Sequence, residues 1–264
     1  MPSDGYIVYC DALDATDLKK VGTPLRSIAF EPSQITQLDE APRALPKYQI
    51  LTFTKAPTYE ELLQICSRPT AAIVETNYDC DIASAPSSLT DVTARSFQID
   101  MSSASAYSLD LASILIRRFE CDFEMPDEVK AAIQIALHES IANSLLHGNL
   151  EIGSISNAVD LDNIGEFLDD VESRLADNQL GKRRIKISAT WNGPRISVRI
   201  EDEGRGFDFN SVIWYRRSST HSLRGIGIVD SLVNHLEYSE SGKVLRLEFD
   251  LASPPSAVYG MAVN

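Results

Sequence analysis

The sequence has few cysteines and a shortage of basic residues, and each shortage excludes a class of protein. Its 264 residues include four widely separated cysteines, Cys10, Cys66, Cys80 and Cys121, and no C-x-x-C pair. This spacing argues against a disulfide framework or a zinc site and favours reduced structural thiols. Lys and Arg number 24 against 38 Asp and Glu, which gives a formal net charge of −14. Because duplex binding requires a basic face, we expect no nucleic-acid partner.

Long apolar runs are also missing. No stretch approaches the ~20 apolar residues of a membrane-spanning helix, and the first residues lack the basic-then-apolar pattern of a signal peptide. We therefore expect a cytoplasmic protein that does not contact a membrane. A hydrophobic content of 44% with 23% charged residues is typical of globular proteins. The length allows one large domain or two small ones.

The first 90 residues alternate short β-rich runs with polar stretches, which predicts a small α/β domain. The runs are YIVYCDA, LRSIAFEP, YQILTFT and TAAIVET, with one amphipathic helix at Tyr59–Cys66. The third run and this helix are similar to the last strand and helix of response-regulator receivers, and Asp11 and Asp14 follow the first run. Too few residues precede them for a complete receiver, so we interpret residues 1–90 as a degenerate regulatory or interaction domain. The Ser-, Ala- and Pro-rich segment Asp81–Val92 predicts a linker.

Residues 93–252 predict a second domain, an α+β sandwich in which helices cover one face of a mixed sheet. A hairpin is expected around Asn192–Gly193 and another at Gly242. Residues 253–264 are interpreted as a tail. The helices are expected at Ser108–Phe119, from Pro126 to His147 with a stop at Gly148–Asn149, at about 164–175, and at Ile226–His235.

The long helix carries two polar residues where apolar ones are expected. On a helical wheel Glu139 and Asn143 lie one turn apart beside the apolar face. A carboxylate in such surroundings is usually paired, metal-linked or catalytic. The Asn143 carboxamide oxygen suits Mg²⁺, and Glu139 can act as a general base in phosphoryl transfer. His147, one turn further, either contacts phosphate or caps the helix, and we favour the structural role.

A first glycine loop, Asp202–Phe207, follows the predicted strand RISVRIE. The carboxylate of Asp202 can only accept hydrogen bonds, which suits an exocyclic base amine. Gly204 and Gly206 allow a tight turn and a close approach to a flat ligand. A surface turn or a calcium-like loop gives the same D-x-G-x-G string, so the loop alone is a weak signal.

A second glycine loop contains Arg224, Gly225 and Gly227 and lies where a helix is expected to begin. Exposed backbone N–H groups at a helix start bind phosphate. A packed helix start explains the same string, so this loop is also weak alone.

The order of these motifs is more specific than any one of them. The segments ALHESIANSLLHGNLEIG, IEDEGRGFD and LRGIGIVDSLVNHLEYSESGKVLRLEF resemble the N-box, G1 box and G2 box of the GHKL (Bergerat-fold) ATPases over residues 93–251. The resemblance implies a two-layer Bergerat sandwich that binds ATP and Mg²⁺. It also implies that Glu139 is the catalytic base, Asn143 the Mg²⁺ ligand and Asp202 the adenine-binding acid. The residues implied to line the nucleotide are Gly204, Gly206, Gly225 and Gly227, with Arg224 and His147 beside it.

Two departures from the family pattern stand out. Ser144 occupies the position of a small residue after the metal-binding Asn, and the acidic insert after Asn149 is longer than in minimal anti-sigma kinases. Residues 207–223 correspond to the segment that covers ATP in the family. Within it, Arg216 and Arg217 either contact phosphate or lie in solvent.

The resemblance is greatest to the anti-sigma-factor serine kinases. Histidine kinases carry a helical hairpin with a phosphorylated His upstream, whereas His138 here lies inside the N-box helix. We therefore expect transfer of the γ-phosphoryl group of Mg-ATP to Ser or Thr of a regulatory partner, which is an anti-anti-sigma (STAS) domain or a sigma factor in the family. A homodimer is compatible with this expectation. The alternatives are a non-catalytic ATP-binding or protein-docking module and a histidine phosphorelay component acting in trans.

Overall fold

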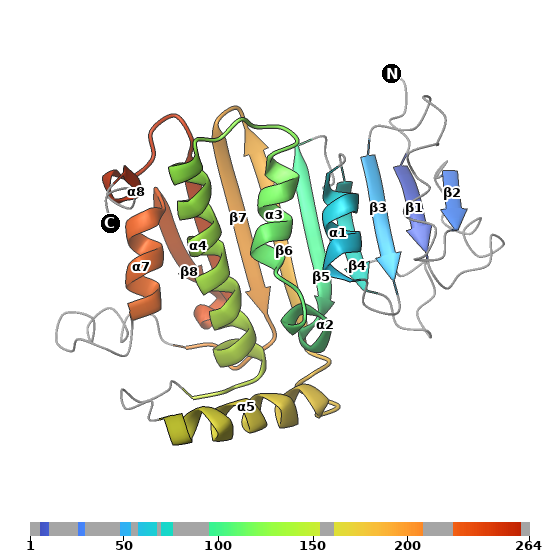
Figure 1. The fold of residues 1–264 in the computed structure, drawn as a ribbon, viewed down its shortest axis with the longest axis vertical. Coiled ribbons are helices and arrows are strands. Elements are labelled where there is room, and N and C mark those ends of the chain that lie inside the picture. The colour runs from blue at the N-terminus through green and yellow to red at the C-terminus, as the bar shows by residue number, and fades with distance from the viewer. Residues whose placement is uncertain are drawn as a thin grey trace.

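The protein folds around one mixed β-sheet with helices on one of its faces (Figure 1). The computed structural model describes residues 6–10, 26–29, 48–53, 58–67, 70–75, 95–153, 161–207 and 224–259. The strands of these segments form a nine-stranded sheet in the order β2-β1-β3-β4-β5-β6-β7-β9-β8. The predicted α+β class is confirmed.

The N-terminal strands are parallel and run on into the rest of the sheet. They are β1 (Tyr6–Cys10), β2 (Arg26–Ala29), β3 (Tyr48–Phe53) and β4 (Thr70–Glu75). Strand β4 pairs in parallel with β5 (Ser96–Ser102), so one hydrogen-bonded sheet contains both halves of the chain. The predicted strands and the helix α1 (Tyr59–Cys66) are confirmed. The predicted linker at Asp81–Val92 lies outside the described residues. The same holds for the two acidic residues after the first strand, Asp11 and Asp14.

The C-terminal strands are antiparallel, as their alternating sequences predict. They are β6 (Arg184–Asn192), β7 (Arg195–Asp202), β8 (His235–Ser239) and β9 (Val244–Asp250). Asn192 pairs with Arg195 across the first hairpin, and Gly193 takes a φ of 58° in its turn. This left-handed backbone is the reason that Asn-Gly predicts such a turn.

The helices differ from the expected ones mainly at their ends. They are α2 (Ser103–Tyr107), α3 (Leu111–Phe119), α4 (Asp127–Asn143), the π-helical turn η5 (Ser144–Asn149), α5 (Leu161–Ala176), α7 (Arg224–Leu232), the 3₁₀ turn η6 (Glu240–Gly242) and α8 (Ser256–Tyr259).

Three of the predicted ends are wrong. The long helix is α-helical only to Asn143 and then widens into η5, so Gly148 and Asn149 belong to the wide turn instead of stopping the helix before it. Helix α7 ends at Leu232, and His235 begins β8. The predicted tail contains α8, whose Val258 is buried.

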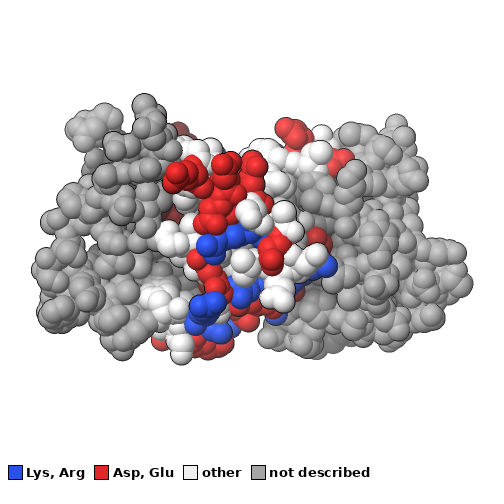
Figure 2. Space-filling view, turned by 90° about the horizontal axis from the view of Figure 1, so that it is seen from below, with Lys and Arg blue, Asp and Glu red and all other residues white. Residues whose placement is uncertain are grey.

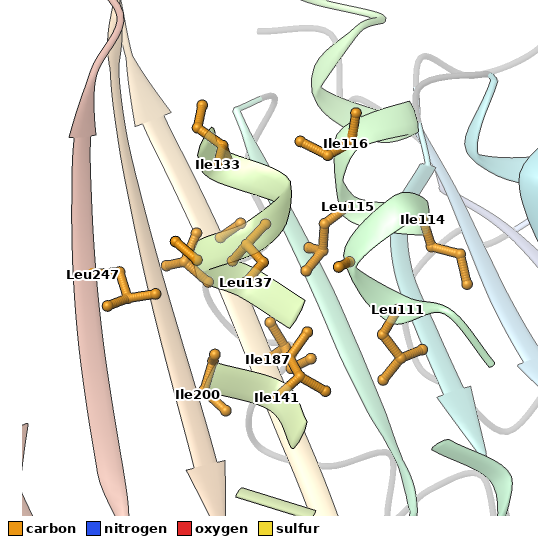
Figure 3. Packing of buried hydrophobic residues seen from close by; sticks show 14 of the residues in the cluster. Leu111, Ile114, Leu115, Ile116, Ile133, Leu137, Ile141, Ile187, Ile200 and Leu247 are labelled. Atoms are coloured by element: carbon orange, nitrogen blue, oxygen red, sulfur yellow. The ribbon is translucent and has the colours of Figure 1, made fainter. Parts of the chain in front are cut away.

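The core lies between the helix layer and the covered face of the sheet. Figure 3 shows Leu115 of α3 and Leu137 of α4 projecting toward Ile187 and Ile200 of the central strands. Apolar burial of this kind is the main stabilising contribution to the fold. It also holds α4, which carries the predicted catalytic residues, against β6 and β7.

A buried arginine joins the N-terminal strands to this core. Arg118 of α3 is fully buried, and its Nε donates to the carbonyl oxygen of Thr70 in β4 at 2.7 Å. Its Nη1 donates to Asp122 at 2.9 Å, and its guanidinium lies 4.9 Å from the ring centroid of Trp191 in β6. These partners compensate the loss of hydration of the buried charge.

Two of the four cysteines have described side chains, and both are free thiols, as predicted. Burial raises the pKa of the Cys66 thiol well above its ordinary value, which keeps this thiol protonated and unreactive. None of the described helices has both the length and the apolar composition that a membrane span requires.

Candidate functional site

A cavity of about 330 Å³ lies between α4, the start of α7, the C-terminal end of β7 and the N-terminal end of β9. Its volume is at the lower end of the range of about 300–1,000 Å³ typical of small-molecule sites. Polar groups and apolar side chains share its wall. The described lining residues are Ser140, Asn143, Ser144, His147, Gly148, Ile152, Asp202, Gly206, Phe207, Gly225, Ile226, Tyr238, Gly242, Lys243 and Leu245.

Asp202 supplies a buried carboxylate at the end of β7. Its side chain is 8% exposed, and it accepts a hydrogen bond from the backbone N–H of Gly204 at 2.9 Å. Burial raises the pKa of Asp202, and the backbone of Gly204, the charge of Lys243 and the Ser144 hydroxyl only partly offset this effect. A carboxylate with a raised pKa inside a cavity is typical of a functional site, where a ligand can donate a hydrogen bond to it.

Two glycines bring η5 against this carboxylate. A Cβ atom at Gly148 would lie 2.6 Å from the carboxyl carbon of Asp202. A Cβ atom at Gly204 would lie 2.3 Å from the carbonyl oxygen of Gly148. Both positions therefore require glycine, because Gly148 packs against the Asp202 carboxylate and Gly204 packs against the backbone of Gly148. The sequence predicted that a flat ligand approaches Gly204 closely, whereas in the structure the backbone of Gly148 lies there.

Asn149 fixes this contact and was not predicted as a site residue. Its carboxamide is fully buried, its Oδ1 accepts the N–H of Glu203 at 2.7 Å, and its Nδ2 donates to the carbonyl of Arg184 at 3.0 Å. One side chain thus joins η5 to the ends of β6 and β7. The sequence offered only the Gly-Asn pair, which is also typical of an ordinary helix end.

Glu139 and Asn143 come together with Gly225, as the order of the motifs predicts. A Cβ atom at Gly225 would lie 2.8 Å from Glu139 Oε2 and 3.6 Å from Asn143 Nδ2. Both side chains are half-buried and therefore reachable by a ligand. A carboxylate, a carboxamide and the first turn of a helix consequently lie together, with Asn143 and Gly225 in the cavity wall and Glu139 beside them, and this combination suits phosphate and a hard cation.

The loop after Asp202 is held by the last hairpin. Gly206 has a φ of 73°, and a Cβ atom there would lie 2.2 Å from the carbonyl oxygen of Ser241. The N–H of Phe207 donates to that same oxygen at 2.8 Å, and its ring packs edge-on against Tyr238 at 5.0 Å. Position 206 therefore requires glycine for structural reasons, and Gly206 also lines the cavity.

The other predicted residues have mixed outcomes. The imidazole Nδ1 of His147 lies 2.7 Å from the carbonyl oxygen of Ile152, which is a structural contact with the segment after the helix and not a cap of its last turn, and His147 also lines the cavity. Gly227 lies in α7 and is half-buried. The side chain of Arg224 and the residues Arg216 and Arg217 lie outside the described part of the chain.

The acidic insert packs under the cavity. Ile152 lines the cavity and also packs with Val171 of α5. Arg174 of α5 donates to the carbonyls of Leu150 and Glu151 at 2.8 and 3.0 Å. Figure 2 shows acidic side chains gathered on this end of the molecule, next to Lys and Arg side chains. The insert is therefore part of the scaffold of the site.

Glu151 connects the insert to the first glycine loop. Its carboxylate lies 2.7 Å from Arg183 and 2.9 Å from Arg205, and the nearby arginines lower the pKa of Glu151. The Arg205 side chain is 85% exposed, so this second ion pair contributes little to stability. The pair instead marks where the glycine loop meets the insert.

The arrangement has two chemically different ends. The Asp202 end offers an acceptor among apolar walls, which suits the amine edge of a flat ring, and the Glu139 end offers groups suited to phosphate and a cation. The described residues contain no cluster of three or more His, Cys, Asp or Glu side chains that could hold a metal ion by itself. A cation at the Glu139 end would therefore take most of its ligands from the substrate and from water.

Comparison of the chain with models of known protein families finds no match, and comparison with curated proteins finds none either. The family indicated by the motifs therefore stays a prediction, and the function has to be argued from the geometry of the site.

Proposed function

We propose that this chain binds Mg-ATP in the cavity between α4 and α7 and transfers the γ-phosphoryl group to a Ser or Thr of a regulatory protein. One observation carries the proposal. Glu139 and Asn143 adjoin Gly225, and Asn143 and Gly225 line the same cavity as the buried Asp202. Residues that are more than 80 positions apart in the sequence are thus adjacent, and they come from two of the three motifs that resemble those of the GHKL (Bergerat-fold) ATPases.

The Asp202 end supports adenine binding. The carboxylate is buried and acceptor-only when ionised, and it shares the cavity wall with Ile226, Leu245 and other apolar side chains. An exocyclic amine would donate to it, and the flat ring would be covered by apolar groups. Because ligand binding would supply a donor to a carboxylate that burial now destabilises, ATP would stabilise its ionised form.

The Glu139 end supports phosphate binding and catalysis. The N–H groups at the start of α7 face a region where Gly225 leaves no side chain in the way. Mg²⁺, held by Asn143 Oδ1 together with phosphate oxygens and water, would neutralise charge that develops on the transferred group. Asn143 thus has a positioning role that a hydrophobic residue cannot fill.

The proposed reaction uses Glu139 as the general base. Its carboxylate takes the proton of the acceptor hydroxyl while that oxygen forms a bond to the γ-phosphorus. The bond from this phosphorus to the bridging oxygen breaks, and ADP leaves with that electron pair. By resemblance to the anti-sigma kinases, the acceptor would be an anti-anti-sigma (STAS) domain, with a sigma factor as a second kind of partner.

The test is transfer of radiolabel from γ-labelled ATP to STAS-domain proteins, with Glu139→Gln and Asn143→Ala as variants. We expect an alkali-sensitive, acid-stable phosphoester that both variants fail to form. Binding of Mg-ATP without transfer would instead identify a non-catalytic module. An acid-labile phosphate on a co-incubated protein would identify a histidine phosphorelay component.

A further inference from the structure

One hydroxyl in the cavity wall has no partner. Ser140 lies on the inner face of α4, is 1% exposed and lines the cavity. Among the described residues, its Oγ is the one buried side-chain polar atom without a hydrogen bond. A serine in a helix usually donates to the carbonyl one turn earlier, and this hydroxyl does not make that bond. Leaving it unsatisfied costs stability.

The position of Ser140 connects it to the base-binding end. It lies one helical turn before Ser144, whose hydroxyl bonds to Asp202. Both serines and Asp202 contribute to the same cavity. A ligand that donates to Asp202 would therefore lie within the region that Ser140 also borders.

We propose that the Ser140 hydroxyl turns toward the cavity when a base is bound and is a specificity-determining contact that donates to one of the ring nitrogens of that base. This inference rests on the proposed function, because it takes the ligand to be ATP. Asp202 can only accept, so it selects the exocyclic amine of adenine. The ring nitrogens beside that amine are acceptors. A carboxylate that accepts from the amine and a hydroxyl that donates to a ring nitrogen therefore match this edge of adenine. Guanine presents a carbonyl and a ring N–H there and fits this pair poorly.

The inference predicts opposite effects on stability and on affinity. Ser140→Ala removes a buried polar atom that has no partner, so the unliganded protein becomes more stable. The same change removes a hydrogen bond to the ligand, so ATP binds about threefold to tenfold more weakly. Substitution of a residue with only a structural role would not raise the stability of the unliganded protein while lowering its affinity for ATP.

The experiment uses the full chain and measures two quantities. Thermal unfolding without nucleotide compares wild type, Ser140→Ala and the matched control Ser173→Ala, which makes the same change on the exposed face of α5. The control accounts for the higher helix propensity of alanine. Calorimetry then measures binding of Mg-ATP, Mg-1-deaza-ATP and Mg-7-deaza-ATP to wild type and to Ser140→Ala.

We expect Ser140→Ala to raise the unfolding temperature more than Ser173→Ala does, by about 2–4 °C. We also expect its affinity loss to disappear with the one deaza analogue that lacks the contacted nitrogen. Equal ATP affinity in wild type and Ser140→Ala overturns this inference alone, as does a loss of equal size for all three nucleotides. Failure of wild type to bind Mg-ATP overturns the proposed function itself.

Discussion

The carboxylate of Asp202 lies directly against the α-carbon of Gly148, so that a Cβ atom at position 148 would be 2.6 Å from the carboxyl carbon. The Asp202 side chain at the end of strand β7 thus packs directly against the backbone of the π-helical turn η5. Wide π turns are frequent at functional sites because they change the direction of a helix end. Here the wide turn places Gly148 against Asp202, the acid that is predicted to recognise the ligand.

Gly148→Ala is expected to displace the Asp202 carboxylate and to weaken Mg-ATP binding by about tenfold or more, the effect of losing a hydrogen bond to a charged group. Calorimetry measures the loss, and circular dichroism checks that the variant folds. Gly165→Ala in α5 is the matched control, because a Cβ atom there meets nothing within 4 Å. The same affinity in both variants would contradict the role assigned to this contact.

Gly225→Ala is expected to reduce phosphoryl transfer more than ATP binding. Its Cβ atom would lie 2.8 Å from Glu139 Oε2, so the carboxylate would have to turn away from its position. Loss of a positioned general base lowers the rate by about 10²–10⁴-fold. Glu139→Gln should give a similar rate with nearly unchanged binding. Single-turnover kinetics measure the step, and a Gly225→Ala rate equal to that of wild type would count against Glu139 as the base.

Asp202→Asn is expected to stabilise the unliganded protein at neutral pH. The pKa of Asp202 is raised above its ordinary value of 3.8, so the folded state binds more protons than the unfolded state between these two values. Asp202 therefore favours folding below pH 3.8, and this contribution is lost as the pH rises through the raised pKa.

The measurement is the difference in unfolding free energy between Asp202→Asn and wild type from pH 4 to pH 8. Taking the difference removes the opposite contributions of acids such as Glu151, whose pKa is lowered. The advantage of the Asn variant should grow with pH across the window and then level off. A difference independent of pH would show that Asp202 titrates normally.

Asn149→Ala is expected to destabilise the fold by about 1–3 kcal/mol, because it removes a fully buried carboxamide and leaves two part-buried backbone groups without partners. These groups are the N–H of Glu203 and the carbonyl of Arg184. Urea unfolding measures the change, with an unaltered slope expected. Asn178→Ala on the exposed surface is the control and should change stability by less than about 0.5 kcal/mol. A similarly small change at Asn149 would contradict its clamping role.

The sequence predicted the strands and most helices from periodicity, whereas the meeting of Glu139, Asn143 and Gly225 was implied only by the resemblance of the ordered motifs to a known family. It could not predict the roles of Gly148 and Asn149. A Gly-Asn pair after a helix indicates a helix end, and only the π-helical widening brings it to β7. Nor did hydrophobic periodicity reveal that Glu151 joins Arg183, directly before β6, to Arg205 of the glycine loop, because long-range ion pairs leave no local pattern.

The most direct test of a Mg-ATP site is calorimetric titration of wild type and Asn143→Ala with ATP, once with Mg²⁺ and once with a chelator. We predict that Mg²⁺ strengthens binding to wild type by about tenfold or more, whereas Asn143→Ala loses this gain and matches wild type in the chelator. No binding to wild type, or the same gain from Mg²⁺ in both proteins, would contradict the account.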